Sequence, residues 1–108
     1  MGEKEKEELK RKKEEIHREQ VKEIAEQLSK AYDYLLDSRR ALANARVRLE
    51  EAKIKNLERK IQGQSEENLQ PLENQIKDLE TKLEDAEQLV RLLEGKAKRT
   101  DPKFFDFL

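Results

Sequence analysis

The sequence predicts an all-α protein: an antiparallel helical hairpin that forms a coiled-coil or four-helix-bundle oligomer. Three observations support this fold class. Charged residues make up 45% of the 108 residues, and the helix formers Glu, Lys, Leu, Ala and Gln are abundant. The apolar residues recur at alternating spacings of three and four, which is typical of packed helices. The two predicted helices also carry opposite charge. High charge is typical of disordered chains too, but this periodicity and a net charge of -1 argue against disorder.

The long helix is predicted over about residues 4–62, since no Gly or Pro interrupts residues 21–61. Its apolar residues form two stripes. The first stripe is Val21, Ile24, Leu28, Ala31, Leu35, Ser38, Leu42, Ala45, Leu49 and Ala52. The second stripe is Ala25, Tyr32, Leu36, Ala43, Val47, Ile54, Leu57 and Ile61. Because a surface helix needs one apolar face, two faces indicate packing against neighbours on two sides.

Residues 1–20 are predicted to be a solvated, charged extension of the long helix. Leu9 and Ile16 are the apolar residues between positions 3 and 20, and acids alternate with bases. Pairs such as Glu7 and Arg11 stabilise a helix by only about 0.2–0.5 kcal/mol each. A nucleic-acid or membrane arm is the alternative, and the alternating charge signs disfavour it.

A turn at residues 63–68 is predicted to separate the helices. Gly63 fits the left-handed conformation that ends many helices. Asn68 is the expected N-cap of the second helix, which places Pro71 in the first turn, where a missing N–H is tolerated. The second helix is predicted over about residues 69–98, and Gly95 is expected to loosen or cap its end.

An antiparallel hairpin is predicted because the two helices have opposite charge. Residues 39–60 contain eight bases and three acids, a net charge of +5, whereas residues 66–94 contain nine acids and three bases, a net charge of -6. A tight turn about residue 66 would place residue i opposite about residue 133 minus i. A single kinked rod is the alternative. The predicted hairpin core is Leu42, Ala45, Leu49, Ala52, Leu69, Leu72, Ile76, Leu79, Leu83, Ala86, Val90 and Leu93.

The second stripe is the predicted oligomer or partner face, because a two-helix hairpin covers only one stripe. Its large residues are Tyr32, Leu36, Val47, Ile54, Leu57 and Ile61. Burying each fully is worth about 1.5–3 kcal/mol. A second hairpin, giving a homodimeric four-helix bundle, is the simplest cover; a different partner helix or an isolated monomer are the alternatives. The predicted register also leaves residues 21–36 without an intrachain partner unless the tail supplies one.

Residues 1–99 are predicted to be one hairpin domain, followed by an aromatic tail at residues 100–108. The tail contains every Phe of the chain, and Asp101-Pro102 is a turn or helix-start signal. The predicted docking residues are Phe104, Phe105, Phe107 and Leu108. They are expected either to pack near residues 24–32 of their own oligomer or to bind another protein.

The sequence predicts no catalytic residue, metal site or cofactor, and therefore no enzyme. The chain has no Cys and a single His, His17, and it lacks a Gly-rich phosphate loop. Without a signal peptide or a long apolar run, a cytoplasmic, intracellular protein is expected, with no membrane partner. The expected function is a structural or adaptor coiled-coil protein that mediates protein–protein assembly. The alternative is a nucleic-acid-associated or regulatory protein that uses the basic face from Arg39 to Arg48, which a pI near 6.0 disfavours.

Overall fold

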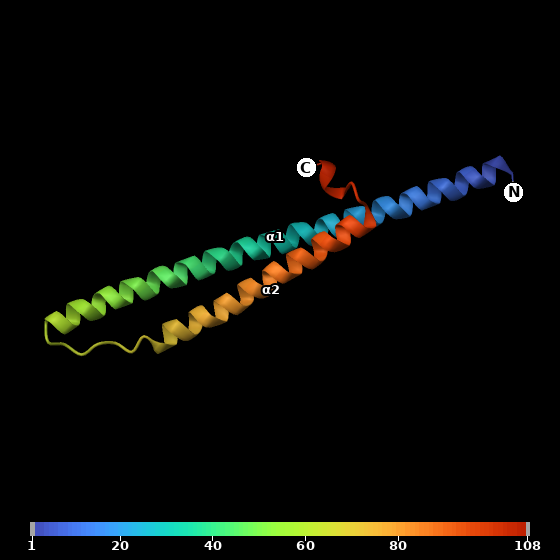
Figure 1. The fold of residues 1–108 in the computed structure, drawn as a ribbon. Coiled ribbons are helices and arrows are strands. Elements are labelled where there is room, and N and C mark those ends of the chain that lie inside the picture. Colours follow the sequence, from blue (N-terminus) through green and yellow to red (C-terminus); the bar gives the residue numbers. More distant parts are fainter. Residues whose placement is uncertain (1, 108) are drawn as a thin grey trace. The chain divides into compact units, whose positions relative to one another are not determined.

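The computed structural model describes residues 2–107, and the fold over this range is all-helical. Helix α1 (Glu3–Ile61) and helix α2 (Gln70–Thr100) are followed by the short 3-10 helix η1 (Phe104–Phe107) (Figure 1). The contacts divide the chain into two compact units. Unit 1 contains α1 up to Tyr32, α2 from Leu89, and η1; unit 2 contains residues 33–88. Within each unit, a segment of α1 packs antiparallel to a segment of α2, which confirms the predicted antiparallel helical hairpin.

Gly63 ends α1 as predicted. Its φ of 73° lies in the left-handed region, which glycine adopts without a steric penalty. The N–H of Gly63 donates to the carbonyl oxygen of Lys60 at 3.2 Å, and the N–H of Gln64 donates to that of Arg59 at 2.7 Å. These two bonds form a Schellman motif, which satisfies carbonyl groups that the last turn of a helix leaves unpaired.

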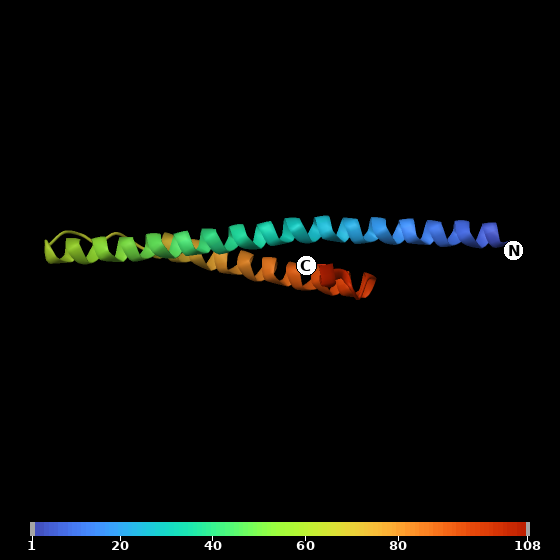
Figure 2. The same ribbon diagram turned by 90° about the horizontal axis from the view of Figure 1, so that it is seen from above.

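The segment between the helices runs back along α1 instead of forming a tight turn (Figures 1 and 2). The Asn56 amide fixes it at Glu67: Nδ2 donates to the Glu67 carbonyl oxygen at 2.9 Å, and Oδ1 accepts from the Glu67 N–H at 2.8 Å. The guanidinium of Arg59 also lies 3.0 Å from the Glu67 carboxylate. One side chain thus satisfies both backbone groups of a loop residue.

This loop path corrects the predicted register. Under that register Arg46 would face residue 87 and Arg59 residue 74, but Arg46 pairs with Glu80 at 3.7 Å and Arg59 with Glu67. Both partners lie seven positions earlier, which is one heptad, so the same faces still meet. An extended residue covers about 3.3 Å and a helical residue about 1.5 Å. Because the loop extends along α1, α2 begins beside residues of α1 that lie nearer the N-terminus than a tight turn would allow.

The core of unit 2 lies between the first stripe of α1 and the apolar seam of α2. Leu42, Ala45 and Ile76 are buried, and Leu49, Leu79 and Leu83 pack around them. Ala45 is only 2% exposed, and its small side chain allows the two helices to approach closely. Among the other residues of the predicted hairpin core, Ala86 and Val90 are buried, and Ala52, Leu69, Leu72 and Leu93 are half-buried.

The start of α2 matches the prediction to within one residue. The Asn68 Oδ1 accepts from the N–H of Gln70 at 3.0 Å, and the first helical bond joins the N–H of Glu73 to the carbonyl oxygen of Leu69. Pro71 therefore lies in the first turn, where its missing N–H has no helical partner. Gly95 does not cap the end of α2, because α2 continues through it to Thr100, within two residues of the predicted end at about residue 98. A helical Gly costs only about 1 kcal/mol relative to Ala, which the surrounding packing can offset.

The core of unit 1 joins α1 to the end of α2. Ile24 and Leu28 are buried against Ala97, which is 0% exposed, and Leu93 packs beside them. The expectation that residues 21–36 lack an intrachain helical partner was therefore wrong. Under the predicted register Ala97 would face residue 36, whereas the observed contacts lie nearer the N-terminus.

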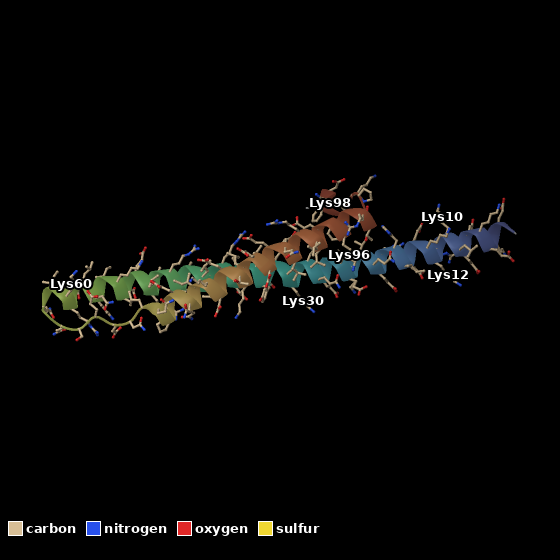
Figure 3. The ribbon with its side chains drawn as sticks, turned by 60° about the horizontal axis from the view of Figure 1, so that its bottom comes forward. Lys10, Lys12, Lys30, Lys60, Lys96 and Lys98 are labelled. Atoms are coloured by element: carbon tan, nitrogen blue, oxygen red, sulfur yellow. The ribbon has the colours of Figure 1, made fainter. Side chains whose placement is uncertain are left out.

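The first turns of α1 carry no buried side chain. Residues 2–20 are all exposed, including Leu9 at 44% and Ile16 at 56%. Their charged side chains project from the helix, as Lys10 and Lys12 do in Figure 3. None of the helices in residues 2–107 combines the length and apolar composition needed to cross a bilayer.

Candidate interaction surfaces

The second stripe of α1 is an uncovered apolar face. In unit 2, the exposed fractions are 46% for Leu36, 52% for Val47, 56% for Ile54, 60% for Leu57 and 85% for Ile61. The first stripe of the same helix is buried or half-buried throughout. Within unit 2, α2 thus covers one apolar face of α1 and leaves the other in water. A row of large exposed apolar side chains on an otherwise charged helix is typical of an interaction surface.

In unit 1, the second stripe continues with Ala25 and Tyr32, which are both exposed. The pKa of the Tyr32 hydroxyl is raised above its ordinary value of 10.0, first by partial burial and second by the carboxylate of Glu94 on α2. Both effects disfavour the phenolate.

Two charged residues lie within the second stripe, at positions that continue its spacing of three and four. Steps of four and three from Leu36 pass through Arg40, Ala43, Val47 and Glu50 before reaching Ile54. Both Arg40 and Glu50 are exposed. Apolar periodicity alone does not identify these two residues, although the same helical spacing reaches them. Any partner that covers the stripe has to accommodate one positive and one negative side chain.

The basic face of α1 lies beside the acidic helix α2 in unit 2. Arg46, in the middle of the Arg39–Arg48 segment, pairs with the Glu80 carboxylate at 3.7 Å. Arg39, Arg40 and Arg48 are exposed. Acidic residues of α2 therefore offset part of the positive potential that a nucleic acid would encounter on this face.

The aromatic tail packs on unit 1 of its own chain. Phe104 and Phe105 are half-buried against the cluster of Ile24, Leu28 and Ala97. Their rings meet edge to face, with centroids 5.0 Å apart and planes at 72°, a favourable geometry for aromatic pairs. The side chain of Phe107 and all of Leu108, which were also predicted docking residues, lie outside the described residues.

Asp101 forms the turn that directs the tail back onto α1. Its Oδ1 accepts from the N–H of Lys103 and its carbonyl oxygen accepts from the N–H of Phe104, both at 2.9 Å. Its Oδ2 lies 3.4 Å from Nε2 of His17 on α1. The hydrogen bond from Lys103, and secondarily the interactions with His17, lower the pKa of this carboxyl below its ordinary value of 3.8. The predicted turn at Asp101-Pro102 thus places the two phenyl rings.

Within residues 2–107, no group of three or more His, Asp or Glu side chains is arranged to hold a metal ion. Comparisons of the chain with protein families, with curated proteins and with solved structures found no match. The geometry distinguishes two surfaces, the second stripe of α1 and the docked aromatic tail.

Proposed function

We propose that this protein is a non-enzymatic structural or adaptor protein, whose helical hairpin joins protein partners through the second stripe of α1. One observation supports this role most strongly. Five large apolar side chains of unit 2 lie along one helix face and are 46% to 85% exposed, while α2 covers the first stripe. Covering them with another protein removes this apolar surface from water, the main driving force for protein association.

In this proposal, the tail has a different task from the stripe. Phe104 and Phe105 contact Ile24 and Leu28 of the same chain. Those contacts stabilise unit 1 and occupy the two rings within their own chain. Partners therefore bind through the second stripe. A tail that releases its rings to another protein would instead make Phe104 and Phe105 the docking site.

Affinity capture from extracts of the native host tests the proposed function. The tagged full chain is compared with V47D/I54D, which places two carboxylates on the stripe, and with Q64D/Q75D, which adds the same charge at exposed polar positions of unit 2. Proteins that bind through the stripe should be retained by the unmodified chain and by Q64D/Q75D but lost from V47D/I54D. Identical retention by all three would contradict the proposal.

The competing role, nucleic-acid binding through Arg39–Arg48, is supported less well because Glu80 already pairs with Arg46. It predicts binding of the intact chain to DNA or RNA that weakens steeply as salt rises. A gel-shift titration at several salt concentrations distinguishes the two roles. Salt-sensitive binding that R39A/R48A abolishes and V47D/I54D preserves would favour the nucleic-acid role.

A further inference from the structure

We propose that the partner of the second stripe is a second copy of this chain. The two copies would bind antiparallel, with the twofold axis at the level of residue 45, so that Arg40 of each copy faces Glu50 of the other. This inference rests on the proposed function and names its partner. It concerns unit 2 alone, in which α2 covers the opposite face of α1 and the stripe is exposed.

The stripe is self-complementary about position 45. Leu36 and Ile54 each lie nine residues from it, Arg40 and Glu50 five, and Ala43 and Val47 two. A twofold axis at this point brings each residue opposite the other member of its pair. Large apolar side chains then meet each other, a small side chain meets a larger one, and a positive charge meets a negative one.

The spacing of the stripe also fits this orientation. Residues 36, 43 and 50 precede a step of four, so they are the d positions of a heptad. Residues 40, 47 and 54 precede a step of three, so they are the a positions. Rotation about position 45 pairs each d residue with an a residue of the other copy. Antiparallel helices that pack through such seams meet in this alternation, so the register satisfies charge, size and geometry together.

A parallel pair in the same register would place like charges together. Arg40 would face Arg40, and Glu50 would face Glu50, in a seam from which water is partly removed. One contact would favour the parallel pair: at the edge of the stripe, Arg46 would reach Glu51 of the other copy. Arg46, however, already pairs with Glu80 of its own chain. Exposed ion pairs contribute little, whereas a charge that loses water without a partner is costly.

The matched segment extends from Leu36 to Ile54. In the next step Leu57 would face Asp33 of the other copy, so Leu57 and Ile61 lie beyond the complementary part. At about 1.5 Å per residue, this segment is about 27 Å long. Leu36 of one copy therefore lies beside Ile54 of the other, and about 27 Å from its own equivalent.

Cysteine cross-linking measures this register, because the chain has no native Cys. The full chains L36C and I54C are each oxidised alone and as an equimolar mixture. The antiparallel register predicts disulfide-linked dimers in the mixture and not in either protein alone. A parallel pair predicts disulfide-linked dimers in each protein alone, and in the mixture only between chains that carry the same cysteine. As a control for random collision, L36C is mixed with R48C, whose cysteine lies on an exposed position outside the stripe.

Charge reversal provides the second measurement. In the antiparallel dimer, R40E would place a carboxylate opposite Glu50 at two symmetric contacts. We expect the dissociation constant to rise about tenfold or more. E50R should weaken the dimer similarly, and R40E/E50R should restore it to within about threefold. In a parallel pair, each single reversal exchanges one like-charge contact for another, so the single variants would not weaken it.

The outcomes separate this inference from the proposed function. Cross-linking of L36C or I54C alone, or a monomeric chain in light scattering, would overturn the antiparallel dimer, while stripe-dependent capture of another protein would still support an adaptor. A dimer that V47D/I54D leaves intact would contradict the inference, whereas identical capture of proteins by the unmodified chain, V47D/I54D and Q64D/Q75D would contradict the proposed function. Cross-linking in the L36C and I54C mixture alone, together with rescue by R40E/E50R, is the result that we expect.

Discussion

Replacing Ile24 with Ala tests the packing of unit 1. Ile24 is 3% exposed and contacts a cluster that includes Leu28, Ala97, Phe104 and Phe105. The substitution removes three carbon groups, worth about 0.8 kcal/mol each in transfer free energy, or about 2.4 kcal/mol together. The cavity that remains adds to this cost, so we expect a total loss of about 3–4 kcal/mol. That is a large share of the roughly 5–15 kcal/mol that stabilises a typical domain.

Ile16 provides a matched control on the same helix and in the same unit. It is 56% exposed, so Ile16→Ala leaves no cavity and loses less than half of the transfer term. Alanine's higher helix propensity offsets part of that loss, and we expect a net cost below about 1 kcal/mol. Urea unfolding followed by circular dichroism compares the two variants. With a typical slope of about 1–3 kcal/mol per molar urea, Ile24→Ala should lower the unfolding midpoint by about 2 M.

Equal costs for Ile24→Ala and Ile16→Ala would refute the reasoning. They would mean that the first stripe of α1 does not pack against the end of α2 and the tail in unit 1. A larger slope in one variant would point to a change in the surface exposed on unfolding, and the comparison would then be repeated by thermal unfolding.

Three further perturbations test the tail and the end of α1. F104A/F105A should cost about 2–4 kcal/mol, since both rings are half-buried, whereas Lys103→Ala, which keeps the backbone turn, should have little effect in thermal unfolding. Gly63→Ala should cost about 1 kcal/mol because the φ of 73° is left-handed; Gly63→Asn should cost less in urea unfolding, and equal costs would contradict this explanation. The lowered pKa of Asp101 means that its ionised form stabilises the fold above its ordinary pKa of 3.8, and this contribution is lost as pH falls through the lowered value. Melting temperatures between about pH 5 and 2 should therefore fall less steeply for Asp101→Asn than for the unmodified chain, and parallel curves would contradict the role of this carboxyl.

The elements of the fold could be predicted from the sequence because their signals are local. Apolar spacing defined both helices, and Gly63 marked the end of α1, where its backbone is left-handed. Pro71 lies in the first turn of α2, as its missing N–H requires. The two stripes of α1 were also correctly separated, because helical periodicity alone decides which residues share a face.

The register between the helices could not be predicted in the same way. It depends on the hydrogen bonds between Asn56 and Glu67, residues eleven apart that meet only because the loop runs back along α1. No local pattern signals that pairing, so the sequence predicts a tight turn instead. The continuation of α2 through Gly95 has a related reason: Leu93 and Ala97, on either side of Gly95, pack in unit 1. Tertiary packing there overrides the low helix propensity of glycine.

The apolar residues of the candidate site could be predicted from the sequence, but the charged residues among them could not. The exposed row from Leu36 to Ile61 follows from periodicity and from the number of helices available to cover it. The placement of Phe104 and Phe105 near Ile24 was one of two alternatives. The turn at Asp101 directs both rings there in unit 1, and binding of the rings to another protein stays a prediction. The pair of Arg40 and Glu50 could not be predicted from apolar periodicity, because both residues are charged and belong to the stripe only as parts of the face that α2 leaves uncovered.

The molar mass of the chain in solution tests the central claim most directly. Light scattering over a dilution series is compared for the unmodified chain and for Ile54→Glu, which places one carboxylate on the second stripe. We predict that the unmodified chain approaches twice its monomer mass of 12.8 kDa at high concentration, and that Ile54→Glu remains at 12.8 kDa. The same mass for both proteins at every concentration would contradict assembly of this chain through the second stripe of α1.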